Sequence, residues 1–254
     1  MKEEKKQVVA ITGGCGRIGS SLAKDLLASG HTVLLGDINK DKLKKLKRKL
    51  NSSNIEIFSG DLTTKKNIDN FINFGVKKYG KISSVVCCSY PTSKYWGSKF
   101  EDLKENFLKE DLYKQLGATI ILCQRMIKYF LKKKEGNLIL ISSVQGVQAP
   151  KFEHYDNLKM SSPIEYSAIK SGIIAVSRYL AKYYKNKNIK INCISPGGIK
   201  DKQPELFVQR YKKSCNSKGL LEGKDIAKLI MFLLSEKSKY ITGQNLVIDD
   251  GWTL

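Results

Sequence analysis

Short apolar runs alternate with amphipathic segments along almost the whole chain. The apolar runs predict buried strands, and the first of them, Val8–Thr12, ends directly in glycines. The other expected strands are Thr32–Leu35, Ile55–Phe58, Ser84–Cys88, Asn137–Ser142, Lys190–Ile194 and Asn245–Ile248. Apolar residues at helical spacing predict the helices Arg17–Ser29, Asp41–Leu50, Lys66–Tyr79, Leu103–Lys133 with a break near Lys109, Ile164–Tyr184 and Lys224–Leu234.

Strands that alternate with helices at this spacing are typical of βαβ units, in which helices cover both faces of a parallel sheet. Because crossovers between parallel strands are right-handed, we expect a doubly wound parallel sheet, the α/β architecture of the Rossmann fold. No Pro/Ser-rich linker and no internal repeat divides the chain. We therefore expect residues 1–254 to form a single domain.

The composition is that of a folded protein without a membrane anchor. Hydrophobic residues make up 41% of the 254 residues, which is enough to bury a full core. No apolar run approaches the roughly 18–20 residues of a membrane span, and the charged N-terminal residues carry no signal-peptide pattern. We therefore expect a cytoplasmic protein with no membrane partner. The six cysteines lack the spacing of metal ligands, so we expect neither disulfides nor a metal site.

The net charge of +21 has two interpretations. It can attract an anion such as a nucleotide, a phosphosugar or a nucleic acid, or it can reflect A/T-rich codons, since Lys, Asn, Ile and Tyr are all frequent. Only five of the 45 basic residues are Arg, whose forked guanidinium suits phosphates and bases. The Lys residues are also spread along the chain, so we expect no nucleic-acid partner.

A glycine-rich segment, Thr12–Gly19, lies between the first expected strand and the first expected helix. Glycines permit a tight turn whose backbone N–H groups approach a pyrophosphate, and the start of a helix favours negative charge. A glycine cluster alone could be an ordinary turn, but this position favours a dinucleotide site. The candidate cofactor-binding residues here are Gly13, Cys15, Gly16, Arg17, Ile18 and Gly19.

Asp37 follows the second expected strand. A carboxylate at this place accepts hydrogen bonds from the adenosine ribose hydroxyls and repels a 2′-phosphate, so we expect NAD(H) rather than NADP(H) as cofactor. Arg17 and Lys40 are the residues that could instead neutralise that phosphate. After the third strand, a turn is expected to place Asp61 near the adenine, and its neighbour Leu62 is a further candidate cofactor-binding residue.

Tyr166 and Lys170 stand four residues apart, on one face of an expected helix. A nearby ammonium favours the phenolate and so lowers the pKa of a tyrosine, which makes the phenol a usable general acid/base. Tyr155 and Lys159 have the same spacing, but they lie in a polar, loop-like segment. Ser143 ends the strand just upstream, where a hydroxyl can polarise a substrate oxygen or simply cap the strand.

Together, in this order, the motifs resemble the short-chain dehydrogenase/reductase family from Val8 to the C-terminus. The matching positions are Thr12–Gly19, Asp37, Asp61, Ser143, Tyr166, Lys170, Pro196–Gly198, Thr242–Gln244 and Asp250–Gly251. The resemblance implies that Tyr166 is the acid/base, that Lys170 lowers its pKa and holds the nicotinamide ribose, and that Ser143 polarises the reacting group. It places three further residues against the nicotinamide: Pro196, Gly198 and Ile199. It also implies a homodimer or homotetramer.

A narrower resemblance concerns bacterial oxidoreductases of flagellin modification and surface-sugar synthesis. The segments that carry it are Ser89–Pro91, Trp96–Phe100, Ala149–Glu153, Pro196–Ile199 and Gln203–Glu205. This similarity implies a small-molecule substrate of the sugar type, either a sugar phosphate or a nucleotide sugar.

The chain departs from the family at two places beside the expected site. Cys87-Cys88-Ser89 stands where the family usually has Asn-Asn-Ala or Asn-Ala-Gly lining the cofactor. The family also has an Asn in the long helix before Ser143, where it organises a proton-relay water. That position falls near Tyr113 to Gln115, where the Gln115 amide is the available substitute.

The segment between Ser143 and Tyr166 is longer than in most members of the family. Its residues 147–165 have the length of a lid or binding loop. Lys151 and Lys159 are placed to meet a substrate phosphate, and His154 is a candidate second acid/base. The alternative is a solvated loop without a binding role. The candidate substrate residues are Ser143, Lys151, His154, Tyr155 and Lys159.

The sequence thus predicts an NAD(H)-dependent oxidoreductase that moves a hydride to or from a secondary alcohol or ketone of a sugar derivative. Two alternatives stay open. The first is a cofactor-binding homologue with little catalysis, such as a sensor or scaffold, which the two departures favour. The second is a reductase of the same family that acts on a non-sugar carbonyl such as a 3-oxoacyl group.

Overall fold

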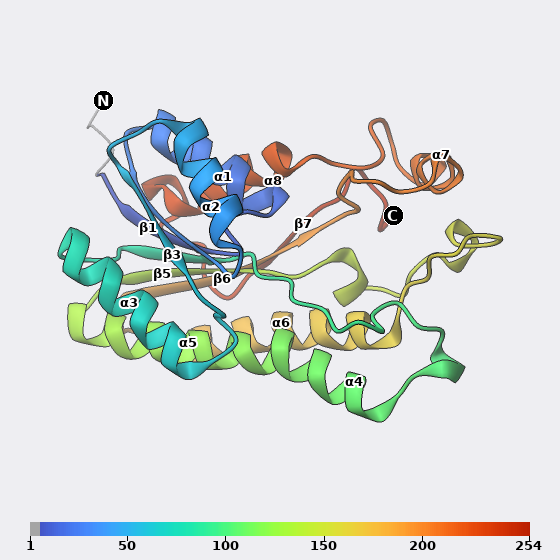
Figure 1. The fold of residues 1–254 in the computed structure, drawn as a ribbon, viewed down its shortest axis with the longest axis horizontal. Coiled ribbons are helices and arrows are strands. Elements are labelled where there is room, and N and C mark those ends of the chain that lie inside the picture. The colour runs from blue at the N-terminus through green and yellow to red at the C-terminus, as the bar shows by residue number, and fades with distance from the viewer. Residues whose placement is uncertain (1–5) are drawn as a thin grey trace.

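The computed structural model describes residues 6–254, in which seven parallel strands form one sheet between two layers of helices (Figure 1). The spatial order of the strands is β3-β2-β1-β4-β5-β6-β7. Their bounds are β1 Val8–Thr12, β2 Thr32–Asp37, β3 Ile55–Ser59, β4 Ser84–Cys87, β5 Gly136–Ile141, β6 Ile189–Pro196 and β7 Asn245–Ile248. The expected doubly wound α/β fold is confirmed.

The central strands are apolar on both faces because each face is covered by helices, as Figure 1 shows. The helices on one face are α1 Arg17–Ala28, α2 Lys40–Leu50 and α8 Gly223–Leu234. Those on the other face are α3 Lys65–Tyr79, α5 Ala118–Lys133 and α6 Ile164–Tyr183. Successive residues of β1 point to opposite faces, so Val9 packs in the core of the first helical layer and Ala10 in that of the second.

The expected elements occur with boundaries that differ by at most two residues, with two exceptions. The break expected near Lys109 is wrong, because α4 (Glu105–Asp111) runs through this residue. It continues through a π-helical segment, Leu112–Gly117, into α5, since a wider turn absorbs the irregularity without interrupting the helix. The second exception is α7, Glu205–Lys213, which the sequence pattern did not predict.

The chain moves outward from β1 to β2 and β3 and then returns to the other side of β1 for β4. The direction of strand addition therefore reverses between β1 and β4, and such a reversal leaves a crevice at the carboxyl ends of the strands. None of the helices in residues 6–254 combines the length and apolar character that crossing a bilayer requires.

Candidate active site

A cavity of about 780 Å³ lies at the carboxyl ends of the strands, where the strand order reverses. It brings together residues that were predicted from separate motifs. The predicted residues that line it are Gly13, Cys15, Gly16, Arg17, Ile18, Gly19, Asp37, Asp61, Leu62, Ser143, Tyr155, Tyr166, Lys170, Pro196, Gly198 and Ile199. Lys151, His154 and Lys159 are not among the lining residues.

The glycine turn between β1 and α1 exposes bare backbone to this cavity. Gly13 has a φ of +64°, and a Cβ added to it would lie 2.6 Å from the carbonyl oxygen of Cys88. Both observations exclude a larger residue at this point. The backbone N–H of Gly14 donates to the Gly36 carbonyl over 3.1 Å, which ties the turn to β2.

Asp37 joins the end of β2 to the same turn. Its two carboxylate oxygens accept hydrogen bonds from the backbone N–H groups of Cys15 and Asn39, each over 3.0 Å. Burial and the adjacent Asp37 carboxylate raise the pKa of the Cys15 thiol to about 12, so the thiol is uncharged at neutral pH.

Of the two cations expected near Asp37, Arg17 lines the cavity and Lys40 does not. The Arg17 guanidinium forms an ion pair with Asp201, which follows β6. Lys40 does not line the cavity, whereas Lys42, two residues further along α2, does. The cations in the cavity lining beside Asp37 are thus Arg17 and Lys42, and Arg17 is already paired with Asp201.

Asp61 and Leu62 occupy the turn after β3. The Asp61 carboxylate accepts hydrogen bonds from the backbone N–H and the hydroxyl of Thr63, over 3.0 and 2.7 Å. Leu62 packs closely on Gly36, because a Cβ atom added to Gly36 would lie 2.7 Å from the Cδ1 atom of Leu62. The turn therefore presents one apolar and one anionic side chain beside Asp37.

Tyr166 and Lys170 lie one turn apart on α6, and the Lys170 Nζ atom is 5.5 Å from the centre of the Tyr166 ring. The ammonium donates a hydrogen bond to the Ile141 carbonyl over 3.3 Å. Burial lowers the pKa of Lys170 to about 8. Burial also raises the pKa of Tyr166, against the opposing effect of the Ser143 hydroxyl. The net direction for Tyr166 is opposite to that expected from the ammonium alone, because desolvation disfavours the phenolate.

Two aromatic side chains cover Tyr166 and were not predicted as site residues. The ring centres of Tyr90 and Trp96 lie 5.8 and 5.9 Å from that of Tyr166, in edge-to-face contact. Both come from the segment that follows β4, and they also contact each other at 5.6 Å. Their signal in the sequence was the narrower resemblance carried by Ser89–Pro91 and Trp96–Phe100. The three rings form one aromatic cluster at the phenol.

The segment before α6 places His154 behind the cavity wall. This side chain is 2% exposed, and its Nε2 atom lies 2.9 Å from the Ser214 hydroxyl. Its ring packs against Tyr211 with centres 5.5 Å apart, and burial lowers its pKa. In this position the imidazole joins the segment to the end of α7.

The other polar residues of 147–165 take different positions. The Tyr155 side chain lines the cavity. The Lys151 ammonium lies 5.2 Å from the Trp252 ring, outside the lining, and Lys159 is exposed. Neither lysine therefore belongs to the lining that Tyr155 shares with Tyr166 and Lys170.

The far wall of the cavity is made by α7 and the C-terminal tail, which the sequence did not mark as part of the site. Phe207, Tyr211 and Trp252 line it. The Tyr211 hydroxyl accepts a hydrogen bond from the Gly198 N–H over 2.5 Å, and its ring stacks on Trp252 at 5.9 Å. No local pattern identified these residues, because their meeting depends on how the tail folds back on α7.

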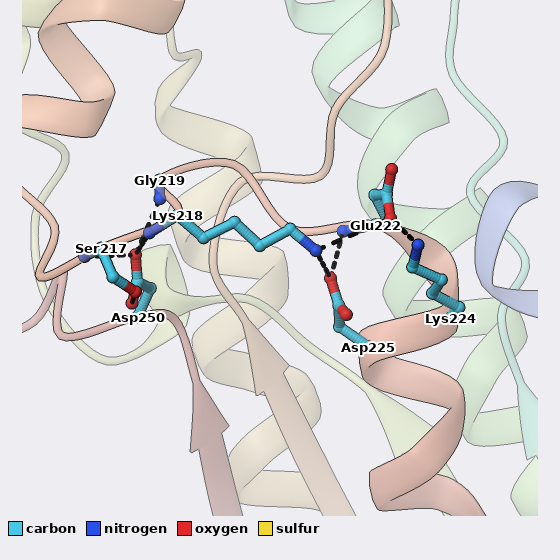
Figure 2. Close-up of polar contacts among 7 residues, drawn as sticks. All are labelled: Ser217, Lys218, Gly219, Glu222, Lys224, Asp225 and Asp250. Atoms are coloured by element: carbon cyan, nitrogen blue, oxygen red, sulfur yellow. Dashed lines mark hydrogen bonds and ion pairs between the residues drawn. The ribbon is translucent and has the colours of Figure 1, made fainter.

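A network centred on Asp250 holds the tail in place, as Figure 2 shows. Its carboxylate accepts hydrogen bonds from the N–H groups of Ser217, Lys218 and Gly219 and from the Ser217 hydroxyl, over 2.5 to 3.0 Å. These bonds lower the pKa of Asp250 to about 2. The Lys218 ammonium continues the network to Asp225 at the start of α8.

Gln115 lies in the π-helical segment and is 4% exposed. Its backbone carbonyl accepts a hydrogen bond from the Thr119 hydroxyl over 2.6 Å. Neither Oε1 nor Nε2 of its amide has a hydrogen-bond partner within the part of the chain that the structure describes. The two departures from the family are therefore placed differently, because Cys88 lines the cavity and Gln115 does not.

These residues fit a dinucleotide cofactor. The bare backbone at Gly13 and the start of α1 suit a pyrophosphate, and the Asp37 carboxylate suits ribose hydroxyls. The same cavity extends to Tyr166 and Lys170, which a bound nicotinamide would then be able to approach. Within residues 6–254, no cluster of three His, Cys, Asp or Glu side chains could hold a metal ion.

Comparison with known proteins gives relatives along nearly the full length. The family described as enoyl-(acyl carrier protein) reductase matches residues 16–253. The chain is 41% identical to the post-translational flagellin modification protein A of Campylobacter coli, over 98% of this chain and 99% of that protein. It is 26% identical to the 3-oxoacyl-[acyl-carrier-protein] reductase FabG of Thermotoga maritima, over 96% and 97%.

A solved structure agrees with the sequence relatives. The short-chain dehydrogenase of Leptospira borgpetersenii with bound NAD+ superposes with a TM-score of 0.88 and is 29% identical, over 99% of this chain and 94% of that one. The fold, the order of the motifs and the extent of the match all lead to one assignment. The chain belongs to the short-chain dehydrogenase/reductase family of oxidoreductases.

Proposed function

We propose that the protein is an NAD(H)-dependent oxidoreductase that interconverts a secondary alcohol and a ketone. The observation that carries this proposal is that Ser143, Tyr166 and Lys170 share one cavity with the glycine turn and Asp37. Mere cofactor binding does not require a phenol one helical turn from a buried ammonium. The proposal therefore takes precedence over the sensor or scaffold alternative.

Each of the three side chains has a separate role in the reaction, which follows from its position. When bound, the nicotinamide accepts or donates the hydride. In oxidation, the Tyr166 phenolate takes the hydroxyl proton while the C–H hydride leaves and the C=O bond forms. In reduction, the phenol returns that proton to the oxygen. Lys170 stabilises the phenolate, and Ser143 holds the substrate oxygen by a hydrogen bond.

Asp37 supports NAD(H) over NADP(H), because its carboxylate repels a 2′-phosphate. The Arg17 guanidinium is engaged by Asp201 and is less available to neutralise that phosphate. The Leptospira relative was solved with NAD+ bound, which agrees with this preference. The family also supports a homodimer or homotetramer in the cytoplasm.

The substrate class is proposed from the relatives. Similarity to a flagellin modification protein supports a sugar phosphate or nucleotide sugar used in flagellin or surface-glycan synthesis. The match to acyl-carrier-protein reductases supports a second candidate, the reduction of a 3-oxoacyl group. Both reactions use the same acid/base pair and differ in what the cavity wall must recognise.

The test combines cofactor binding with one substitution. We expect NADH to bind tighter than NADPH in a fluorescence titration, and Tyr166→Phe to lower kcat by roughly 10²–10⁴-fold without changing NADH affinity. Turnover is measured with nucleotide sugars, sugar phosphates and 3-oxoacyl thioesters. Tyr179→Phe, an exposed position on the same helix, is the matched control. Full activity in Tyr166→Phe would refute the catalytic assignment.

A further inference from the structure

Charged side chains are distributed unevenly along the cavity. Four of the ionised lining residues, Arg17, Asp37, Lys42 and Asp61, lie where the glycine turn and the ends of β2 and β3 meet. We call this part the cofactor end. The only other Lys, Arg, Asp or Glu side chain among the described lining residues is Lys170, beside the acid/base. Beyond Lys170 the wall carries no formal charge.

We call this uncharged part the substrate end. It is built by parts of the chain that are far apart in the sequence, namely Tyr90–Trp96, Ser143–Gln145, Tyr155–Pro163, Gly197–Gln203, Phe207–Tyr211 and Trp252. Its aromatic lining residues are Tyr90, Trp96, Tyr155, Phe207, Tyr211 and Trp252. A phosphate or carboxylate placed against this wall would lose hydration, and none of the side chains that line the wall offers it a cation, which is costly. Aromatic faces instead suit the C–H face of an uncharged ring.

The polar groups of this wall form a connected string that starts at the catalytic serine. The backbone N–H of Gln145 donates to the Ser143 hydroxyl over 3.2 Å. The Gln145 side chain is held at both ends, because its Oε1 accepts from the Ser162 hydroxyl over 2.5 Å and its Nε2 donates to the Tyr155 hydroxyl over 3.3 Å. The amide is thereby held between two hydroxyl groups.

Part of the hydrogen-bonding capacity of this string is left unused. The amide nitrogen of Gln145 has a second N–H, and its Oε1 has a second lone pair. The Tyr155 hydroxyl accepts from the amide and keeps its own proton for donation. Because Gln145 and Tyr155 both line the cavity, these donors and acceptors lie beside the place where Ser143 and Tyr166 hold the reacting oxygen.

We propose that the substrate end binds an uncharged ring that carries hydroxyl or amide groups, and that Gln145 recognises the group next to the reacting carbon. This inference rests on the proposed oxidoreductase function and narrows it. A phosphate on the substrate, where there is one, lies away from this wall. Gln145 is then a specificity-determining residue that distinguishes a hydroxylated ring from a plain alcohol or an acyl chain.

The first experiment compares three small probes with NAD+ as cofactor. They are trans-cyclohexane-1,2-diol, its monophosphate ester and cyclohexanol, which differ by one group each. We expect kcat/KM to be about tenfold or more higher for the diol than for either of the other two probes. Cyclohexanol loses a hydrogen bond, and the monophosphate buries an unpaired charge. Acetoacetyl thioester with NADH serves as the acyl probe.

The second experiment tests Gln145 itself. Gln145→Leu should lower kcat/KM for the diol by about tenfold or more and leave that for cyclohexanol unchanged, so the preference between the two disappears. The Asn side chain is too short to contact Ser162 and Tyr155 at once. In Gln145→Asn, kcat/KM for the diol should therefore lie between the values of the wild type and of Gln145→Leu. Gln148→Leu, a neighbour that does not line the cavity, is the matched control and should leave both values unchanged.

The outcomes separate this inference from the function on which it rests. Preference for the monophosphate, for cyclohexanol or for the acetoacetyl thioester would overturn the inference while the oxidoreductase function stands. A diol preference that survives in Gln145→Leu would overturn the role of Gln145. If none of the probes, sugar phosphates or nucleotide sugars were turned over, the proposed function would fail together with the inference.

Discussion

The cofactor end of the cavity is made by the ends of adjacent parallel strands, whereas the substrate end is made by loops, α7 and the C-terminal tail. At the cofactor end, most contacts involve backbone groups, such as the Cys15 and Asn39 N–H groups on Asp37. At the substrate end, side chains meet side chains, as in the Ser162–Gln145–Tyr155 string.

This difference explains why one end was predictable in detail and the other only in outline. Backbone recognition depends on glycines and strand ends, which a sequence shows directly. A wall of side chains depends on which loops pack together. The same contrast suggests that substitutions at the two ends should change different measurable quantities.

The largest expected effect comes from Lys170→Met, at the junction of the two ends. Burial lowers the pKa of Lys170 to about 8, so the ammonium is present below pH 8 and is lost above it. Carbonyl reduction creates the phenolate that this ammonium stabilises. We therefore expect kcat/KM for reduction to be flat near pH 7 and to fall above about pH 8. The variant should be roughly 10²-fold slower at pH 7 and lack this fall.

The pH profile of kcat/KM, which reports groups of the free enzyme, is the measurement. Lys182→Met, at an exposed position near the end of the same helix, is the control and should keep the wild-type profile. Persistence of the fall near pH 8 in Lys170→Met would assign that titration to another group.

A smaller effect is expected at the cofactor end alone. Asp37→Asn removes the negative charge and keeps one of the two acceptor oxygens, so only one of the bonds from the Cys15 and Asn39 N–H groups can persist. NADH affinity should fall about 10- to 100-fold, because a hydrogen bond to a charged group is worth about 1.5–3 kcal/mol, and NADPH affinity should rise. Calorimetric titration of both cofactors measures the change. Asp41→Asn, on an exposed part of α2, should alter neither affinity, and unchanged selectivity in Asp37→Asn would contradict its role.

The smallest expected effect is confined to the substrate end. Asp250→Asn weakens the bonds to Ser217, Lys218 and Gly219, so hydrogen exchange at these amides should become a few-fold faster while that of Cys15 stays the same. The low pKa of Asp250, about 2, keeps the carboxylate ionised above about pH 4, so wild-type protection should not change between pH 5 and 8. Asp156→Asn, exposed and outside the network, is the control. Faster exchange at Cys15 would show that the two ends are coupled.

The sequence identified a candidate substrate segment but not which of its side chains would line the cavity. Four residues of the segment 147–165 were predicted to contact the substrate, namely Lys151, His154, Tyr155 and Lys159. Of these four, Tyr155 lines the cavity and the other three do not. His154 is buried against Tyr211 because the segment folds onto α7, an element that the apolar pattern did not reveal. The π-helical segment that buries Gln115 was equally invisible, since its residues have ordinary helical composition.

The sequence by itself determined the alternation of strands and helices, the glycine turn, Asp37 and the spacing of Tyr166 and Lys170. Each of these depends on the local chain or on one helical turn, and the strand order then brings them to one edge of the sheet. Only the tertiary structure decided that Tyr90, Trp96, Gln145, Tyr211 and Trp252 share a wall. The physical reason is that loops far apart in the sequence are placed by packing against one another, and no local pattern records which of their side chains will meet.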